Sequence, residues 1–292
     1  MPGVRRLALF VALAAAVPAR AQTTGPAPPT PTTYVFPRAL ALSAYRGLDG
    51  DNDGIFYNHA ALAARKRFEV ALDGLVARDG SDTTASFFSG SVVDSTAGPV
   101  TGGFAYTYAK TLGYAPQGLF GGGTNVALSF PFGKSFFVGG TMNYLDLTGG
   151  TNRINAVNVT TGLFWQVAKA LSLGAAGYNL INTCHPDLTP IAFGTGLAAG
   201  PPDLFHVTGD FYRQWGTYVT NVWSAGAEVF IASMAAVRGG WTSDTGRSVQ
   251  WWSAGAGLVV SGFGMDLTYR QAFGAASARV LSAGFKYLVQ NP

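Results

Sequence analysis

Three carboxylates alternate along one short stretch of the chain, "LDGDNDGIFYNHAAL", where Asp49, Asp51 and Asp53 occupy every second position. A calcium loop of the EF-hand type begins in this way, and it also needs a bidentate acidic ligand at its twelfth position. That position is Ala60, so the stretch predicts at most a weak calcium site. The alternative is a turn, because Asp, Asn and Gly tolerate turn geometry and cap a helix that follows.

A second set of charged residues lies in "SAGAEVFIASMAAVRGGW". A tight turn near Ser233 places Glu228 and Arg238 opposite each other on adjacent strands, and a charge inside a narrow pore is costly unless it is paired. Two interpretations remain open, a polar constriction that holds a substrate and a structural belt of ion pairs inside a barrel, and we favour the belt. The predicted lumenal polar network consists of Asp210, Glu228, Arg238, Asp266 and Arg270.

Signals for an enzyme are weak. Asp244, Thr245 and Gly246 form the triplet of aspartic proteases, but that chemistry needs two carboxylates and the triplet occurs once. Asp-Thr-Gly also forms ordinary turns. No Gly-x-Ser-x-Gly nucleophile elbow is present, and "GLFGGG" lacks the lysine of a phosphate loop. We therefore expect no catalytic centre.

Metal and cofactor sites are not expected either. The three histidines, His59, His185 and His206, are far apart in the sequence. Cys184 is next to His185, but adjacent residues of a strand point in opposite directions.

The first residues predict export. Residues 1–21 combine Arg5 and Arg6, the apolar run "LALFVALAAAV" and a small-x-small pattern that ends at Ala21, as in a secretory signal peptide. Cys184 is the only cysteine, so no intramolecular disulfide can form. An exported chain of this kind must be held by its core or by a membrane.

Composition points to the membrane rather than to a soluble surface. Charged residues make up 12% of the chain and hydrophobic residues 48%, whereas a soluble domain carries about 25% charged residues. After the predicted signal, no window contains the roughly 18 apolar residues that a membrane helix needs. The formal charge of +4 includes three arginines of the predicted signal, so the remainder gives no case for nucleic acid as a partner.

The chain divides into three further parts. Residues 22–33, "QTTGPAPPTPTT", form a Pro/Thr-rich linker. Residues 34–66 mix turn signals with one short helical candidate, "YNHAALAARKR". Residues 67–292 contain fourteen segments of alternating character. The predicted strands are 68–79, 83–96, 100–112, 118–131, 134–146, 155–168, 171–182, 188–198, 204–215, 218–232, 234–243, 248–260, 263–273 and 277–289.

The alternation has the period of a strand. In "RVLSAGFKYLVQ", Leu281, Phe285 and Tyr287 share one face, while Ser282 and Lys286 share the other. A soluble sandwich would expose charged residues, but these polar faces carry isolated charges among Ser, Thr and Gly. The sequence therefore predicts an all-β fold, a transmembrane antiparallel β-barrel of about 14 strands (12–16). Residues 34–66 precede this barrel as a separate N-terminal segment. Export and this barrel place the protein in a Gram-negative outer membrane, among membrane lipid, after insertion by the barrel-assembly machinery.

Three stretches resemble the FadL-like outer-membrane barrels and their PorV-like relatives. "FPRALALSAYRGLDGDNDGIFYNHAALAARKRFEV" is similar to their N-terminal signature, which runs from small residues through an acidic turn to Asn-Pro-Ala-x-Leu. Asn58 and Ala60 match this plug motif, whereas His59 replaces the proline that would fix a tight turn. "LSLGAAGYNLINTCHPDLTPIAFGTGLA" and "SAGAEVFIASMAAVRGGW" are similar to later strands of the PorV-like group.

The resemblance implies a fourteen-stranded barrel whose N-terminal segment plugs the lumen. FadL-like members carry hydrophobic small molecules such as fatty acids across the outer membrane, which is the function we expect. PorV-like members serve protein secretion without transporting small molecules, so a secretion or envelope-assembly accessory with a protein partner is the alternative.

Overall fold

The computed structural model describes residues 36–78, 84–112, 118–149, 152–183, 189–215, 219–232, 234–274 and 278–290. The predicted signal peptide, the predicted linker, Cys184 and His185 lie outside these ranges. Within the described residues, no helix has the length and apolar character needed to cross a membrane.

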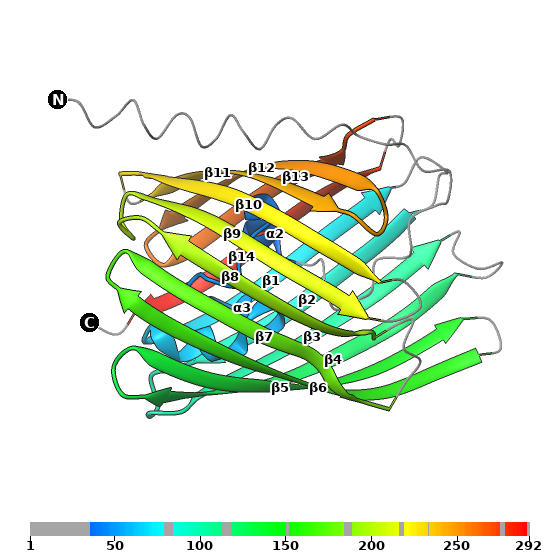
Figure 1. Cartoon of the computed structure of the whole chain (residues 1–292), viewed down its shortest axis with the longest axis horizontal. Coiled ribbons are helices and arrows are strands. Elements are labelled where there is room, and N and C mark those ends of the chain that lie inside the picture. The colour runs from blue at the N-terminus through cyan, green and yellow to red at the C-terminus, as the bar shows by residue number, and fades with distance from the viewer. Residues whose placement is uncertain are drawn as a thin grey trace.

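Fourteen strands form one closed antiparallel barrel, in which each strand pairs with its neighbours in sequence and β1 pairs with β14 (Figure 1). The predicted strand number and order are confirmed, and most strand ends lie within three residues of the predicted positions. The strands are β1 (Arg67–Arg78), β2 (Thr84–Asp94), β3 (Thr101–Leu112), β4 (Leu119–Phe132), β5 (Phe136–Gly149), β6 (Asn152–Ala168), β7 (Leu171–Asn182), β8 (Ile191–Ala199), β9 (Phe205–Trp215), β10 (Thr220–Ile231), β11 (Ala235–Asp244), β12 (Val249–Val260), β13 (Phe263–Ala272) and β14 (Arg279–Gln290).

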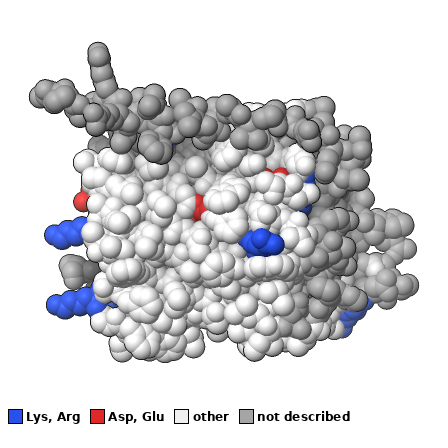
Figure 2. Space-filling view, viewed as in Figure 1, with Lys and Arg blue, Asp and Glu red and all other residues white. Residues whose placement is uncertain are grey.

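The apolar faces of the strands point outward. Leu281 and Phe285 of β14 are 52% and 61% exposed, whereas Ser282 between them is 1% exposed. Figure 2 shows one side of the barrel, on which Lys, Arg, Asp and Glu are sparse. An apolar outer wall around a polar interior is the orientation of a transmembrane barrel and the reverse of a soluble sandwich. This confirms the predicted fold class.

The two rims of the barrel differ in their connections. At the rim where β1 begins, most connections are short turns such as 133–135, 169–170 and 261–262, and the longest are 95–100 and 200–204. We call this the short-turn rim. The opposite, long-loop rim has longer connections such as 113–118 and 183–190. In bacterial barrels the short turns face the periplasm and the longer loops face outward.

The N-terminal segment, residues 36–66, lies inside the ring of strands (Figure 1), and we call it the plug. It contains α2 (Pro37–Leu42), α3 (Gly54–Tyr57) and the 3-10 helix η3 (His59–Ala64). Helix α2 packs against β10–β14, whereas η3 packs against β3–β6 on another part of the wall. The helix predicted over residues 57–67 is instead the shorter 3-10 helix η3, because the backbone is extended at Asn58 (φ −155°) before it and at Arg65 (φ −132°) after it.

Glycines of the wall let the plug backbone approach closely. A Cβ atom added at Gly139 of β5 would lie 2.7 Å from the amide nitrogen of Ala60. One added at Gly240 of β11 would lie 2.6 Å from the carbonyl oxygen of Ala41. Both distances are far below van der Waals contact, so a residue with a side chain at either position would displace the plug.

Candidate functional site: the plug and the lumenal wall

Glu228 and Arg238 face each other across the β10–β11 hairpin. They are direct partners in the register, and Arg238 Nε donates to Glu228 Oε1 at 2.6 Å. Arg238 also forms an ion pair with Asp266 of β13. Glu228 is 0% exposed, so its charge depends entirely on these partners.

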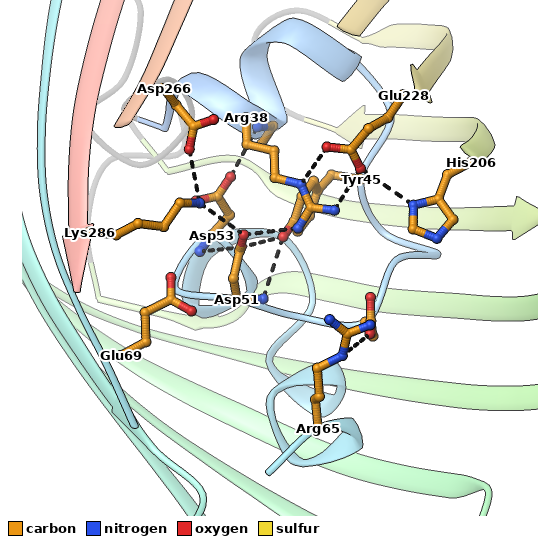
Figure 3. Close-up of polar contacts among 12 residues, drawn as sticks. Arg38, Tyr45, Asp51, Asp53, Arg65, Glu69, His206, Glu228, Asp266 and Lys286 are labelled. Carbon is orange, nitrogen blue, oxygen red and sulfur yellow. Dashed lines mark hydrogen bonds and ion pairs between the residues drawn. The ribbon is translucent and has the colours of Figure 1, made fainter. Parts of the chain in front are cut away.

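The plug supplies further charges to this cluster (Figure 3). Arg38 Nη2 lies 2.8 Å from Glu228 Oε2, and Arg38 Nη1 lies 3.0 Å from Asp51 Oδ2. On the wall, Lys286 Nζ lies 2.9 Å from Asp266 Oδ2 and 3.7 Å from Asp51 Oδ2. The cluster therefore alternates between basic and acidic side chains, and it joins α2 and the acidic turn to four strands of the wall, β10, β11, β13 and β14.

Asp210 belongs to a second anchor. Its carboxylate lies 3.0 Å from Arg46 Nη1 of the plug and accepts hydrogen bonds from the backbone amides of Tyr45 and Arg46. Arg46 Nε also donates to Tyr178 Oη at 2.7 Å. The Arg46 guanidinium lies 4.9 Å from the ring centroid of Tyr212, a distance that allows a cation–π interaction. Asp210 thus holds the plug at a place separate from Glu228.

His206 borders the Glu228 cluster, whereas Arg270 contacts an aromatic ring. His206 Nδ1 lies 3.4 Å from Glu228 Oε2, and its ring meets Phe230 edge-on at 5.5 Å. Arg270, also predicted in the network, lies with its guanidinium 5.0 Å from the ring centroid of Trp251.

The three alternating carboxylates of the plug point to different partners. Asp49 pairs with Arg65 at 2.8 Å, Asp51 pairs with Arg38, and Asp53 Oδ2 accepts the backbone amide of Ala39 at 2.9 Å. The predicted capping of the following helix is wrong, since Asp53 makes no side-chain cap on α3 and instead caps the first turn of α2. Among the described residues, no group of three or more His, Cys, Asp or Glu side chains is placed to hold a metal ion.

The pKa values of Asp51 and Asp53 shift in opposite directions. Burial raises the pKa of the Asp51 carboxyl, but the charges of Arg38 and Lys286 outweigh burial and hold that pKa well below its usual range. Burial and the nearby charge of Asp51 raise the pKa of the Asp53 carboxyl well above its usual range. The two cations therefore favour the charged form of Asp51, the carboxylate that they contact.

The plug motif residues Asn58, His59 and Ala60 fasten η3 to the wall. Asn58 Nδ2 donates to the carbonyl oxygens of Arg46 and Leu163, both at 3.0 Å. The carbonyl oxygen of Ala60 accepts from Ser129 Oγ at 2.8 Å. His59 is 1% exposed, and burial lowers the pKa of its imidazole to about 4.

Asp244 of the Asp-Thr-Gly triplet lies at the end of β11, where a hairpin turn begins. Its carboxylate accepts from the hydroxyl of Thr220 and from the backbone amide of Arg247. These contacts are those of an ordinary structural turn.

Sequence reasoning missed the plug cations. Arg38 and Arg46 lie in a segment without a regular hydrophobic period. The sequence therefore does not predict which way their side chains point or which residues they contact. Lys286 could have been found, because it shares the inward parity of Ser282 and Gly284 on β14.

An apolar surface lies beside this polar network. One buried cluster joins plug residues such as Phe36 and Phe56, whose ring centroids are 4.6 Å apart, to inward-facing residues of the wall. The wall residues near the long-loop rim, each within three positions of its strand end, are Leu75, Ala85, Phe87, Ala109 and Val280. Beside the polar network, an internal space lined by Asp53, Glu69 and Lys286 measures about 10 Å³, which is room for a single water molecule at most.

Comparison with solved structures finds other barrels of the same fold. The CymD monoaromatic hydrocarbon channel has a TM-score of 0.73 at 11% identity, over 88% of this chain and 97% of that one. The Ralstonia pickettii toluene transporter TbuX has a TM-score of 0.67 at 13% identity, over 88% and 98%. The chain shares their fold. A Pseudomonas aeruginosa FadL homologue also aligns, with a TM-score of 0.62 at 12% identity, over 91% of this chain and 98% of that one.

Comparison by sequence gives no relatives. No protein-family model matches the chain, and no curated protein matches it. The fourteen-stranded barrel with an internal N-terminal segment, which the resemblance to FadL-like proteins implies, is confirmed by the fold.

Proposed function

We propose that this protein lets small hydrophobic molecules, with monoaromatic hydrocarbons as the leading class, pass a Gram-negative outer membrane. Residues 1–21 act as the export signal, residues 22–33 as a linker, residues 34–66 as a plug and residues 67–292 as the barrel. CymD is a monoaromatic hydrocarbon channel and TbuX is a toluene transporter. The barrel shares their fold along most of the chain, which supports this substrate class.

The apolar lumenal surface carries this proposal. Leu75, Phe87 and Val280 are inward-facing residues near the long-loop rim, and they are continuous with the apolar core of the plug. A pore for ions or sugars has a polar interior. These three side chains are at most 8% exposed and pack against the plug. A displaced plug would therefore uncover an apolar surface, which a hydrophobic solute can contact without the cost of stripping water from polar groups.

The ion-pair network has the role of a latch in this proposal. Arg38 and Arg46 of the plug reach wall carboxylates, and the space beside the network is too small for a solute. Passage therefore requires a rearrangement of the plug, and the network sets its resting position.

Uptake by intact cells tests the proposal. A Gram-negative host without its own hydrophobic channel would produce the chain, and entry of radiolabelled toluene and of a labelled long-chain fatty acid would be followed. We expect entry of toluene to rise severalfold over the empty vector, and Phe87→Asn with Leu75→Asn to remove most of the gain. Lys169→Gln, at an exposed turn on the short-turn rim, is the matched control. Entry no faster than in the empty-vector cells would refute the transport function and favour an accessory role.

A further inference from the structure

The lipid-facing basic residues of the described strands lie near one rim, whereas the exposed Lys66, Lys134 and Lys169 at the other rim lie outside the strands. Five basic residues lie on the lipid-facing side within two positions of a strand end at the long-loop rim. Among the described strand residues, Asp146 is the one acidic side chain on this part of the outer wall. The basic residues are Arg78, Lys110, Arg153, Arg213 and Arg279.

Two of these cations flank a pocket on β3–β6. The register places Lys110, Phe120, Thr148 and Arg153 in one row across the four strands. Neighbouring strands are about 4.8 Å apart, so the ends of this row are separated by roughly 14 Å. The pocket has a volume of about 350 Å³, and Phe120, Thr148 and Arg153 line it.

A glycine of the pocket floor makes room for an aromatic ring. In the next row toward the barrel centre, Gly122 stands between Tyr108 and Asp146, and a Cβ atom at Gly122 would collide with the side chain of Tyr106. Gly121 beside it has a φ of +148°, a conformation that a residue with a side chain rarely adopts. The Tyr106 side chain therefore lies against Gly122, and both residues line the pocket.

The chemistry of the pocket changes with depth. At the rim, Arg153 donates to both carboxylate oxygens of Asp146, at 2.9 and 2.7 Å, while its side chain remains 64% exposed. Further down lie the aromatic rings of Tyr106 and Tyr144, which are 47% and 42% exposed. Cations above aromatic rings match the boundary between lipid head groups and acyl chains.

An apolar track continues below the pocket. The row beneath it contains Phe104, Val126 and Met142, which are 45%, 42% and 53% exposed on the outer wall. An acyl chain lying against these residues would leave its head group at the level of Lys110 and Arg153.

We propose that this pocket binds an anionic lipid, with a head-group phosphate between Lys110 and Arg153 and an acyl chain along Tyr106, Tyr144 and Met142. Charge complementarity selects the phosphate, since Arg and Lys bind phosphate oxygens through charge-assisted hydrogen bonds. The position on the lipid-facing wall selects a lipid over free phosphate. Because the lipid-facing basic residues of the strands lie near the long-loop rim, we expect the lipid to belong to the leaflet at that rim.

Lipid titration of the detergent-purified full chain, read by native mass spectrometry, tests the site. The probes are dipalmitoyl phosphatidate, dipalmitoyl phosphatidylcholine and inorganic phosphate. We expect the phosphatidate to bind and the other two probes to bind weakly. Because each basic side chain near a membrane surface contributes about 1 kcal/mol, and about 1.4 kcal/mol corresponds to a tenfold change, the double variant Lys110→Gln with Arg153→Gln should bind phosphatidate roughly thirtyfold more weakly. Asp146→Asn should strengthen binding, because it frees the Arg153 guanidinium.

The matched control is the pair Lys134→Gln and Lys169→Gln, which removes two exposed cations at the short-turn rim. Binding that falls as far in this pair as in the Lys110 and Arg153 pair would show unspecific charge attraction and overturn the proposal. Equal binding of phosphatidylcholine would overturn it too, as would displacement of phosphatidate by toluene. Heat-modifiable gel migration of every variant confirms that the barrel is folded.

Discussion

Glu228 joins the wall to the plug, since it pairs with Arg238 of the wall and with Arg38 of the plug. Replacing it by glutamine leaves two buried arginines with less negative charge than they need. We expect Glu228→Gln to lower the free energy of unfolding by about 3–5 kcal/mol, the cost of breaking a buried ion pair. The urea midpoint of heat-modifiable migration measures the change, with Lys169→Gln as the control. Equal midpoints would show that the cluster is not structural.

His59 makes the stability of the plug depend on pH. Burial lowers the pKa of its imidazole to about 4, whereas an unfolded histidine titrates near about 6.5. Between these values the released plug binds a proton that the docked plug does not, so docking weakens as the pH falls. The full effect is about 3 kcal/mol, because a tenfold difference in proton affinity between the two states corresponds to about 1.4 kcal/mol.

Limited proteolysis of the plug at pH 7 and pH 5 measures this effect. Cleavage should be faster at pH 5 in the wild-type chain, after correction for the activity of the protease. His59→Gln should remove most of the pH dependence. A dependence that survives in His59→Gln must come from another group.

The part of the site that lies on strands could be predicted from the sequence residue by residue. Glu228 and Arg238 could be paired because a short turn and a period of two fix both the facing and the register. Arg38 and Arg46 could not be paired, because the plug has too little regular structure to show a period. Asp51 was identified as a candidate ligand, and its partners proved to be cations of the protein itself.

At the scale of elements, the fit between η3 and β5 depends on the absence of a side chain. Gly139→Val would place a side chain against the backbone of Ala60, so we expect η3 to leave the wall while the barrel still closes. Chymotrypsin cleavage at Phe56 and Tyr57 should then accelerate severalfold. Gly102→Val on β3 is the matched control, because a Cβ atom there meets nothing within 4 Å. If chymotrypsin cleaves the two variants equally slowly, the wall and not the plug has moved to accommodate the new side chain.

Elements differ in how far the sequence determines them. All fourteen strands are visible as alternating segments, because each strand must present one face to lipid and the other to the lumen. The helices of the plug are short and depend on tertiary contacts. Their boundaries were therefore predicted less well than those of the strands.

At the scale of the whole molecule, the decisive property is whether the plug moves relative to the barrel. Ser43 Oγ of the plug lies 3.0 Å from Ser253 Oγ of β12, so Ser43→Cys with Ser253→Cys, in a Cys184→Ser background, offers a reversible crosslink. Oxidation would fix α2 to the wall, and we expect toluene entry to fall severalfold and to recover after reduction. Ser43→Cys alone should show no response to oxidation. If toluene entry is undiminished in the oxidised double variant, passage does not require displacement of α2. The solute would then have to leave through the barrel wall between the long-loop rim and α2.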